Sequence, residues 1–502
     1  MSTLAERPRR WRWSLRLVIA CAAGAVVAAA YAALSDDPRV PILLAIILLA
    51  AAAGAGVAMS ERDAGGILTV MLALLFLVPE NYVIKGPLKS VGNPSLMLGL
   101  FCLVLWVAAR LMGTIRGKQA HPIRWVVWFY LVTGVTAYVT ATTRYLTSDE
   151  SGSVVRSIFP FLAMVGIAML AVDGLETVER VTTVLRRLVA LVAVQATIGI
   201  LEYSAGLDYH QLAHLPGLTA NTEITSGERG GFARVEGAAA HPIEFSVVLA
   251  AAAPLALHFA LNARNPKERR RFWFMLAAIL AAIPLPVSRS GIVGLLVALG
   301  VYCVALTPRA RINLAVLGVL GLGMFRAAVP GLLGTLKSFF LAGSSDDSIT
   351  GRTEDYGHIP ALMHGHWWFG RGFGTFQPAA YFYLDNQFLM SLLNGGFFAV
   401  AALLAIFVVG GGVARGARKR LEDRPARDLG QAIAAAISCL AISALTFDEF
   451  SFLQCAFVLF LLVGCAGALW SSAVESSGER SVPKPTARRR SIGRPRRAHA
   501  TV

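Results

Sequence analysis

Residues 450–470 read FSFLQCAFVLFLLVGCAGALW and contain no charged side chain. About 20 apolar residues in an α-helix cross the ~30 Å hydrocarbon core of a bilayer. An uncharged run of this length predicts a transmembrane helix, since a helix pairs its own backbone polar groups where lipid offers no partner. This run therefore predicts that the protein lies in a membrane, and the rest of the sequence repeats its pattern.

Apolar runs recur along the 502 residues, of which 56% are hydrophobic and only 15% are charged. The mean hydropathy of +0.61 is high for a soluble domain. Three runs hold only about 14 residues, so we expect about 12 to 14 transmembrane helices in an all-α, polytopic integral membrane protein. The cores of the fourteen runs are Leu17–Leu34, Val40–Met59, Gly66–Pro79, Leu96–Ala109, Trp125–Ala141, Ser157–Val172, Leu188–Tyr203, Ile243–Leu261, Phe272–Val287, Gly291–Leu306, Ile312–Phe325, Phe388–Gly410, Ala432–Phe447 and Phe450–Trp470.

The basic residues give the chain a net charge of +16, which in a soluble protein would favour nucleic-acid binding. Here 34 of the 46 lysines and arginines lie in the two terminal segments and in alternate connections, on one side of the membrane if the runs cross it in turn. Because Lys and Arg are retained on the cytoplasmic side, we expect both termini in the cytoplasm. The basic tail is then expected to contact membrane lipids, and no nucleic acid is expected as a partner.

This topology divides the chain into membrane segments and connections, two of which are longer than a connection needs. We expect these two to be large extracytoplasmic loops. The second is rich in aromatic residues, which favours packing against the membrane face or a sugar-binding surface. The expected segments are a basic cytoplasmic N-terminus (1–16), N-terminal transmembrane helices (17–203), the first loop (204–242), central transmembrane helices (243–331), the second loop (332–387), C-terminal transmembrane helices (388–470) and a disordered, basic cytoplasmic tail (471–502).

Arg289 is the strongest single functional signal from the residues alone. It lies in the stretch PVSRSG at 286–291, a short break between two apolar runs, and so at or just beneath the outer membrane surface. A charge at that depth is costly and indicates a functional site. An arginine that only reaches the lipid headgroups fits the position equally well.

The residues predict neither a metal site nor a cofactor site. All six cysteines lie inside apolar runs without a C-x-x-C pair, which argues against disulfides and zinc. The outward segments contain no D-x-D pair, and we expect Asp346-Asp347, in serine-rich sequence, to be solvated. The stretch GRGFG at 370–374 follows no predicted strand, which argues against dinucleotide binding. We therefore expect no metal and no cofactor.

Several short motifs occur in a fixed order in and around the two loops. RVEG at 234–237 leads to His241-Pro242, and SRSG at 288–291 opens a later span. The second loop adds TGR at 350–352, HWWFGRGFGTF at 366–376 and DNQFL at 385–389, followed by NGG at 394–396. Over about residues 190–470, the motifs in this order resemble the O-antigen ligase and polymerase superfamily.

The resemblance implies a membrane glycosyltransferase that moves a glycan from a polyprenyl diphosphate carrier to an acceptor hydroxyl group. The reaction would occur on the outer face of the bacterial cytoplasmic membrane. A diphosphate leaving group needs positive charge, which arginine supplies through planar, bidentate contacts. Arg234 and Arg289 are the first candidates for this catalytic role, with Arg352 and Arg371 as substrate-binding cations. No divalent metal is needed.

The attacking hydroxyl group also benefits from a general base. In the ligases a histidine opens the helix after the second loop, and here the matching residue is Asp385. Asp385 is therefore a candidate catalytic residue, with Glu236 and His241 as substrate-binding residues that can take over its role. The structural alternative is that Asp385 caps the following helix.

Three classes of function stay open at this point. A transporter or flippase of a lipid-linked sugar needs charges near mid-membrane and internal repeats, and only Gln195 and His258 come close to mid-span. A role as a scaffold subunit of an envelope polysaccharide complex would not explain the pattern of the arginines in the sequence. We favour the glycosyltransferase, and a polymerase over a ligase because of Asp385 and the Ala- and Arg-rich composition. Its expected partners are the lipid-linked glycan donor, a glycan or lipid-glycan acceptor, membrane lipids and other envelope polysaccharide assembly proteins.

Overall fold

The computed structural model describes most of the chain from residue 64 onward. The described residues are 64–85, 92–112, 121–213, 215–221, 227–229, 231–329, 331, 334, 356–378 and 380–481. The first two predicted spans, Leu17–Leu34 and Val40–Met59, lie outside these residues. Arg352 and the Asp346-Asp347 pair also lie outside them.

Each apolar run predicted between residues 66 and 470 coincides with a helix. Eight of the described helices are long and apolar enough to cross a bilayer, and α3 and α11 are shorter apolar helices. The prediction of an all-α, polytopic membrane protein is confirmed. The helices are α3 (Ala64–Leu77), α4 (Pro94–Leu111), α5 (Pro122–Thr142), α6 (Ser148–Gly174), α7 (Val178–Ala205), α9 (Pro242–Asn262), α10 (Pro266–Ala282), α11 (Arg289–Tyr302), α12 (Pro308–Ala328), α15 (Gln387–Arg420), α16 (Arg424–Ser443) and α17 (Leu453–Ser481).

The sequence marks where these helices begin. Asn93, His121 and Thr147 accept backbone hydrogen bonds in the first turns of α4, α5 and α6. Such caps satisfy amide groups that a helix leaves unpaired. Proline follows the cap in α4, α5, α9 and α10, at a position where its missing N–H group costs nothing. The capped ends determine which residues lie at the ends of the bundle.

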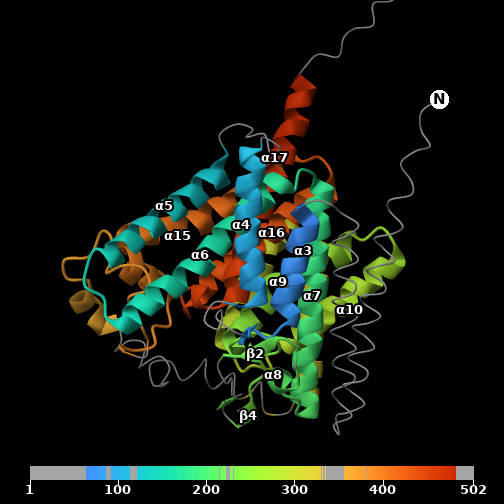
Figure 1. Cartoon of the computed structure of the whole chain (residues 1–502). Coiled ribbons are helices and arrows are strands. Elements are labelled where there is room, and N and C mark those ends of the chain that lie inside the picture. Colours follow the sequence, from blue (N-terminus) through green and yellow to red (C-terminus); the bar gives the residue numbers. More distant parts are fainter. Residues whose placement is uncertain are drawn as a thin grey trace, which may run out of the picture.

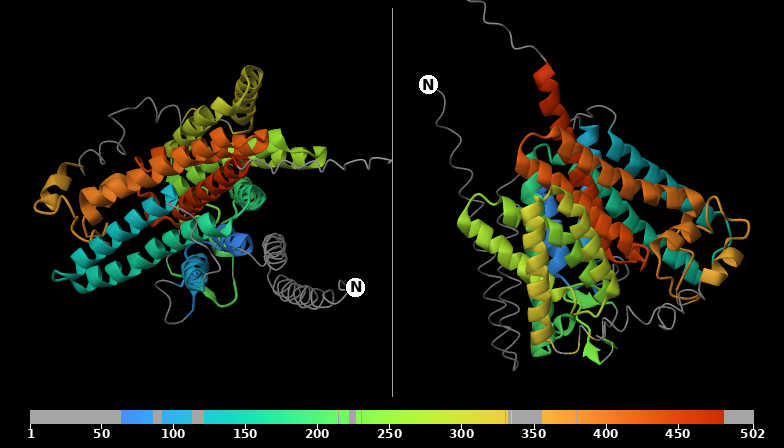
Figure 2. Two further views of the ribbon diagram at one scale, coloured as in Figure 1. Left: turned by 90° about the horizontal axis from the view of Figure 1, so that it is seen from above. Right: turned by 180° about the vertical axis from the view of Figure 1, so that it is seen from behind.

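Helices α9 and α17 lie at the centre of the bundle. Their most apolar stretches are 94% and 89% buried, whereas that of α12 is wholly unburied. The small residues of α9 (PIEFSVVLAAAAPLALHFALN) let α7, α10, α11 and α16 pack closely around it. Helix α12 stands at the edge of the bundle (Figure 2), where its apolar side chains are available to lipid.

Figure 1 shows short elements at the lower end of the bundle and the C-terminal end of α17 at the upper end. The described part of the second loop lies at the left of the view, beside the ends of α5, α6 and α15. The elements at the lower end are α8 (Tyr209–Leu212), an antiparallel pair of β1 (Tyr82–Ile84) with β2 (Leu218–Ala220), and an antiparallel pair of β3 (Glu228–Arg229) with β4 (Phe232–Ala233). The 3-10 helix η3 (Glu449–Ser451) precedes α17 at this same end, and η1 (Cys303–Ala305) follows α11 at the other.

Charged and polar contacts hold the opposite end together. Arg124 pairs with Asp173 at 2.6 Å, and Arg186 pairs with Glu268 at 2.8 Å. These residues belong to the basic connections of the sequence. The fold thus separates those connections from the first loop, whose described residues lie at the end with the short strands.

Helix α15 is broken near its start. Gly395 and Gly396 leave the helical region, with φ angles of −141° and +66°. The N–H of Phe397, after the break, donates to the carbonyl oxygen of Trp367 at 2.8 Å. The second loop therefore supplies a carbonyl oxygen for a backbone N–H group that has no partner within the broken helix.

The glycines of HWWFGRGFGTF let the second loop pack tightly on three helices. A Cβ atom on Gly370 would lie 2.5 Å from the backbone of α15, and one on Gly372 would lie 2.5 Å from the backbone of α5. A Cβ atom on Gly374 would lie 2.8 Å from the hydroxyl of Ser157 in α6. All three also have positive φ angles, which glycine adopts at low cost. The motif is therefore a packing motif, and it fixes the loop against the ends of α5, α6 and α15.

Candidate functional site

The turn between α10 and α11 carries Arg289 at its end. Val287 in this turn has a φ of +54° and is fully buried, and that conformation costs a side chain with a Cβ atom roughly 1–2 kcal/mol. Ser288 precedes α11 without a side-chain capping bond, and its buried Oγ has no partner among the described residues. The N-terminus of α11 therefore keeps amides without a side-chain cap next to a half-buried arginine, an arrangement that favours an anion.

Arg234 is attached to this same turn. Its Nε donates a hydrogen bond to the carbonyl oxygen of Pro286 at 3.0 Å. Pro286 lies three residues before Arg289 in the sequence. Arg234 comes from the first loop and Arg289 from the membrane break, so this contact brings the two predicted arginines to one turn.

Burial shifts the pKa values of both Glu236 and His241 toward the uncharged form. Burial raises the pKa of Glu236 to about 8, with Glu202 adding to the shift and Arg234 opposing it. Burial, with the charge of Arg234, lowers the pKa of His241 to about 4, against the effect of Asp385. Neither side chain therefore cancels the positive charge of Arg234.

His241 also has a structural role at the start of α9. Its Nδ1 accepts the N–H of Ile243 at 3.2 Å, and its ring lies 5.6 Å from that of Phe452. The predicted His241-Pro242 pair is thus a helix cap followed by proline, a common start of a helix.

Asp385 does not cap α15, so the structural alternative for this residue is wrong. Asn386 is the N-cap, and its Oδ1 accepts the first backbone N–H groups of the helix at 2.9 and 3.2 Å. Asp385 is half-buried and lies within electrostatic reach of both His241 and Asp448. It is therefore close to the group that surrounds Arg234.

Arg371 is held by a different set of contacts. One Nη donates to the hydroxyl of Tyr381 at 2.9 Å, and the guanidinium lies 5.1 Å from the centre of the Tyr381 ring. The charge of Arg371 also acts on Glu150, which pairs with Arg144 at 2.7 Å. These contacts hold Arg371 on the second loop and near the start of α6.

Several acidic residues with buried carboxyl oxygens were not predicted from the sequence, and three acidic residues of this kind lie near the site. Glu202 accepts the backbone N–H groups of Glu236 at 3.1 Å and of Gly237 at 2.9 Å, and so holds the RVEG motif. Glu244 accepts the backbone N–H of Gln454 at 2.8 Å. Both residues lie inside predicted spans, where a carboxyl group is unusual, so the sequence itself contained a signal for them. The third, Asp448, lies between two spans and gave no such signal.

Gln195, which the sequence places near mid-span, is part of the packed interior. Its Nε2 donates to Oε1 of Gln454 at 2.9 Å, and Gln454 Nε2 donates to the carbonyl oxygen of Leu75 at 3.2 Å. Both glutamines are fully buried. This polar pair joins α7 to α17, as interhelical hydrogen bonds do in membrane proteins.

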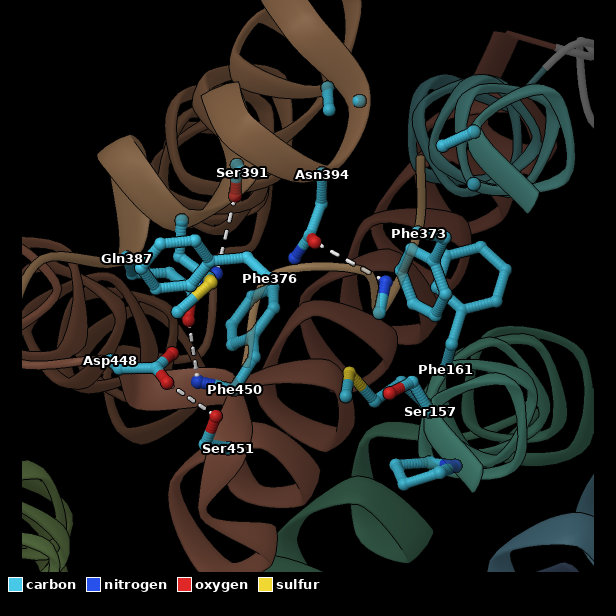
Figure 3. Close-up of a pocket in the computed structure, with 18 of the residues that line it drawn as sticks. Ser157, Phe161, Phe373, Phe376, Gln387, Ser391, Asn394, Asp448, Phe450 and Ser451 are labelled. Carbon is cyan, nitrogen blue, oxygen red and sulfur yellow. Dashed lines mark hydrogen bonds between the residues drawn. The ribbon is translucent and has the colours of Figure 1, made fainter. Parts of the chain in front are cut away.

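A cavity of about 410 Å³ lies between α4, α5, α6, α15 and the turn before α17 (Figure 3). In the turn, Oδ2 of Asp448 accepts a hydrogen bond from Ser451, whereas its buried Oδ1 has no partner among the described residues. Burial raises the pKa of Asp448 to about 6 against the effect of Ser451, and the charge of Asp385 adds to the increase. The lining includes the aromatic residues Phe161, Phe373, Phe376 and Phe450 and the polar residues Ser157, Gln387, Ser391, Asn394, Asp448 and Ser451.

Within the described residues, no three His, Cys, Asp or Glu side chains are grouped so that they could hold a metal ion. The five described cysteines are free thiols.

Residues 272–404 match the family model described as O-antigen ligase. The match covers Arg289, the HWWFGRGFGTF motif and Asp385, and it confirms the resemblance over this segment. The chain is thus a polytopic membrane protein of which residues 272–404 are similar to the O-antigen ligase family. No curated protein matches the chain at a significant level.

Proposed function

We propose that this protein is a polysaccharide polymerase. It moves a glycan from a polyprenyl diphosphate carrier to a hydroxyl group of a second lipid-linked glycan, at the outer face of the bacterial cytoplasmic membrane. The observation that carries the proposal is the 3.0 Å hydrogen bond from Arg234 to Pro286, in the turn that leads to Arg289. The family match supports glycan transfer, and Asp385 at the position of the ligase histidine favours the polymerase.

In this proposal the donor diphosphate binds at the N-terminus of α11. Arg234 and Arg289 pair with its oxygen atoms, and the amides of α11 add partial positive charge. Negative charge grows on the diphosphate as the glycosidic bond breaks, so the two guanidinium groups bind the transition state more tightly than the substrate. These groups supply the positive charge, and the proposal includes no metal and no cofactor.

Asp385 is the proposed general base. The acceptor oxygen attacks the anomeric carbon, and its proton passes to the Asp385 carboxylate. The bond from the anomeric carbon to the diphosphate oxygen breaks, and its electron pair leaves with the diphosphate. Support comes from the half-buried position of Asp385, within electrostatic reach of His241 beside Arg234. Arg352 and Arg371 are proposed to contact other anionic parts of the substrate.

The proposed orientation has both termini in the cytoplasm and the two long loops outside. It rests on the retention of basic connections in the cytoplasm, which here lie at the bundle end opposite to the short strands. The single-cysteine variant Gly227→Cys, in a background without the native cysteines, tests it. A membrane-impermeant thiol reagent added outside intact cells or spheroplasts should label this variant. Labelling from the cytoplasmic side alone would overturn the orientation and with it the reaction at the outer face.

The function itself is tested by comparing lipid-linked glycans in cells with and without this protein. Loss of a polymerase should cause single repeat units to accumulate on the lipid carrier. Long chains that stay on the carrier would instead identify a ligase, and unchanged glycans would refute both. The Arg289→Ala variant should fail to restore polymer, whereas Arg270→Lys, at an exposed position at the opposite end of the bundle, should restore it.

A further inference from the structure

We infer that the cavity of about 410 Å³ between α5, α6, α15 and the turn before α17 is the binding site for the acceptor glycan. This inference rests on the proposed function and adds to it the place and the chemistry of the second substrate. Its volume lies in the range of about 300–1,000 Å³ that is typical of small-molecule sites.

The lining combines the two kinds of group that bind sugars. Phe373, Phe376 and Phe450 offer aromatic surfaces on which the C–H faces of a sugar ring can pack. Asn394 and Asp448 offer polar atoms for hydroxyl groups. Figure 3 shows these side chains converging on one hollow from the second loop, α15 and the turn before α17.

Asp448 is the polar group with the clearest need for a ligand. Its Oδ1 is buried and has no partner among the described residues, while Oδ2 already accepts a hydrogen bond from Ser451. A buried carboxyl oxygen without a partner costs free energy, and a sugar hydroxyl group in the cavity would satisfy it.

The same features argue against a lipid chain as the occupant. A polyprenyl tail offers no hydrogen bond, so it would leave Oδ1 of Asp448 unsatisfied and would cover the polar atoms of Ser157 and Asn394 with hydrocarbon. Apolar chains have other places to lie, because the apolar surface of α12 is unburied.

The cavity is joined to the donor site through one turn. Thr446, at the start of the connection before α17, donates a hydrogen bond to Ser290 at 2.8 Å, and Ser290 directly follows Arg289. Further along the same connection, Asp448 lines the cavity and is close enough to Asp385 for their charges to interact. An acceptor in the cavity would thus lie next to the proposed base and beside the turn that binds the donor.

Binding measurements on the purified full chain in lipid nanodiscs test this inference. The acceptor probe is the glycan released by mild acid from the lipid-linked glycans of the same cells, labelled at its reducing end. The donor probe is polyprenyl diphosphate without a glycan. Ser157→Trp fills the cavity from α6, and Val155→Trp is its matched control because Val155 is 48% exposed on the same helix and does not line the cavity.

Wild-type protein and Val155→Trp should bind the released glycan equally and saturably. Ser157→Trp should weaken this binding at least tenfold without weakening that of polyprenyl diphosphate. Asp448→Asn, a much smaller change, should weaken glycan binding several-fold and so gives a second result if Ser157→Trp does not fold.

Two results would overturn the inference. The first is an absence of saturable glycan binding to the wild-type protein, and the second is a loss of polyprenyl diphosphate binding in Ser157→Trp while glycan binding persists. The second result would assign the cavity to the lipid chain. Failure of the proposed function is distinguishable, because it shows as unchanged lipid-linked glycans in cells that lack the protein, whatever the cavity binds.

Discussion

Replacing Arg234 by lysine tests whether two arginines act on one diphosphate. Lysine keeps the positive charge but has no Nε–H group to donate to the carbonyl oxygen of Pro286, which Arg234 contacts at 3.0 Å. An ammonium also binds phosphate as a point charge, whereas a guanidinium binds two oxygen atoms at once. We therefore expect Arg234→Lys to slow glycan transfer strongly, although the charge is conserved.

The size of the effect follows from the contact that is lost. A hydrogen bond from a charged group contributes about 1.5–3 kcal/mol. If it orients Arg234 in the transition state, its loss slows transfer roughly 10- to 150-fold, since 1.36 kcal/mol corresponds to a factor of ten. Arg234→Ala also removes a charged partner of the leaving group, so its effect should be larger than that of lysine.

The assay is the initial rate of polymer formation in nanodiscs supplied with the lipid-linked repeat, at matched amounts of folded protein. Arg270→Lys is the control, because Arg270 is exposed at the other end of the bundle and the change is chemically the same. Transfer at the wild-type rate by Arg234→Lys would refute the reasoning, since neither the Pro286 contact nor the paired geometry would then matter.

Three further predictions concern the base, the electrostatics and the loop. Asp385→Asn should slow transfer on the order of 10²- to 10⁴-fold, because an amide cannot act as a base. Its thermal unfolding should be unchanged, because the cap of α15 is the next residue. If the variant made polymer at the wild-type rate, Asp385 would have no part in the mechanism. Binding of polyprenyl diphosphate should weaken as the pH rises through about 8, where Glu236 ionises beside Arg234. The Glu236→Gln variant should bind without this pH dependence. If its binding depended on pH as much as that of the wild type, Glu236 would not be the cause. Gly396→Ala should destabilise the protein by about 1–3 kcal/mol in thermal unfolding, because its φ is +66° and its Cβ would lie 2.3 Å from the docked loop. Gly412→Ala, in open space on the same helix, is the control and should not destabilise.

Much of the fold was predictable because a membrane restricts the chain to apolar helices of a certain length. The runs around Leu96 and Ile312 were counted as short, yet their helices extend to 18 and 21 residues, since polar end residues continue the hydrogen-bond pattern. The break at Gly395 was not predicted as a break. It depends on the second loop, whose backbone pairs with the helix across the break, and no local pattern in the helix encodes that contact.

Residues of the candidate site were predictable where a charged side chain occurs in an apolar stretch of sequence. Arg289 stood out as a charge inside an apolar stretch, and Glu202 carried the same signal, which was overlooked. Asp448 could not be found in this way, because it joins the cavity lining only through packing beside α6 and α15, which are far away in the sequence. The sequence alone does not show which residue caps α15, since Asp385 and Asn386 both suit a helix start and only the backbone geometry identifies Asn386 as the cap.

Burial explains how the proposed diphosphate site fits among so many carboxyl groups. Glu202, Glu236 and Asp385 all lie within electrostatic reach of Arg234 or of the residues beside it. If Glu236 were ionised at neutral pH, its charge would offset that of Arg234 and repel a diphosphate. Burial instead raises the pKa of Glu236 to about 8, which favours the neutral carboxyl group, so Glu236 offers hydrogen-bonding capacity with little negative charge beside Arg234.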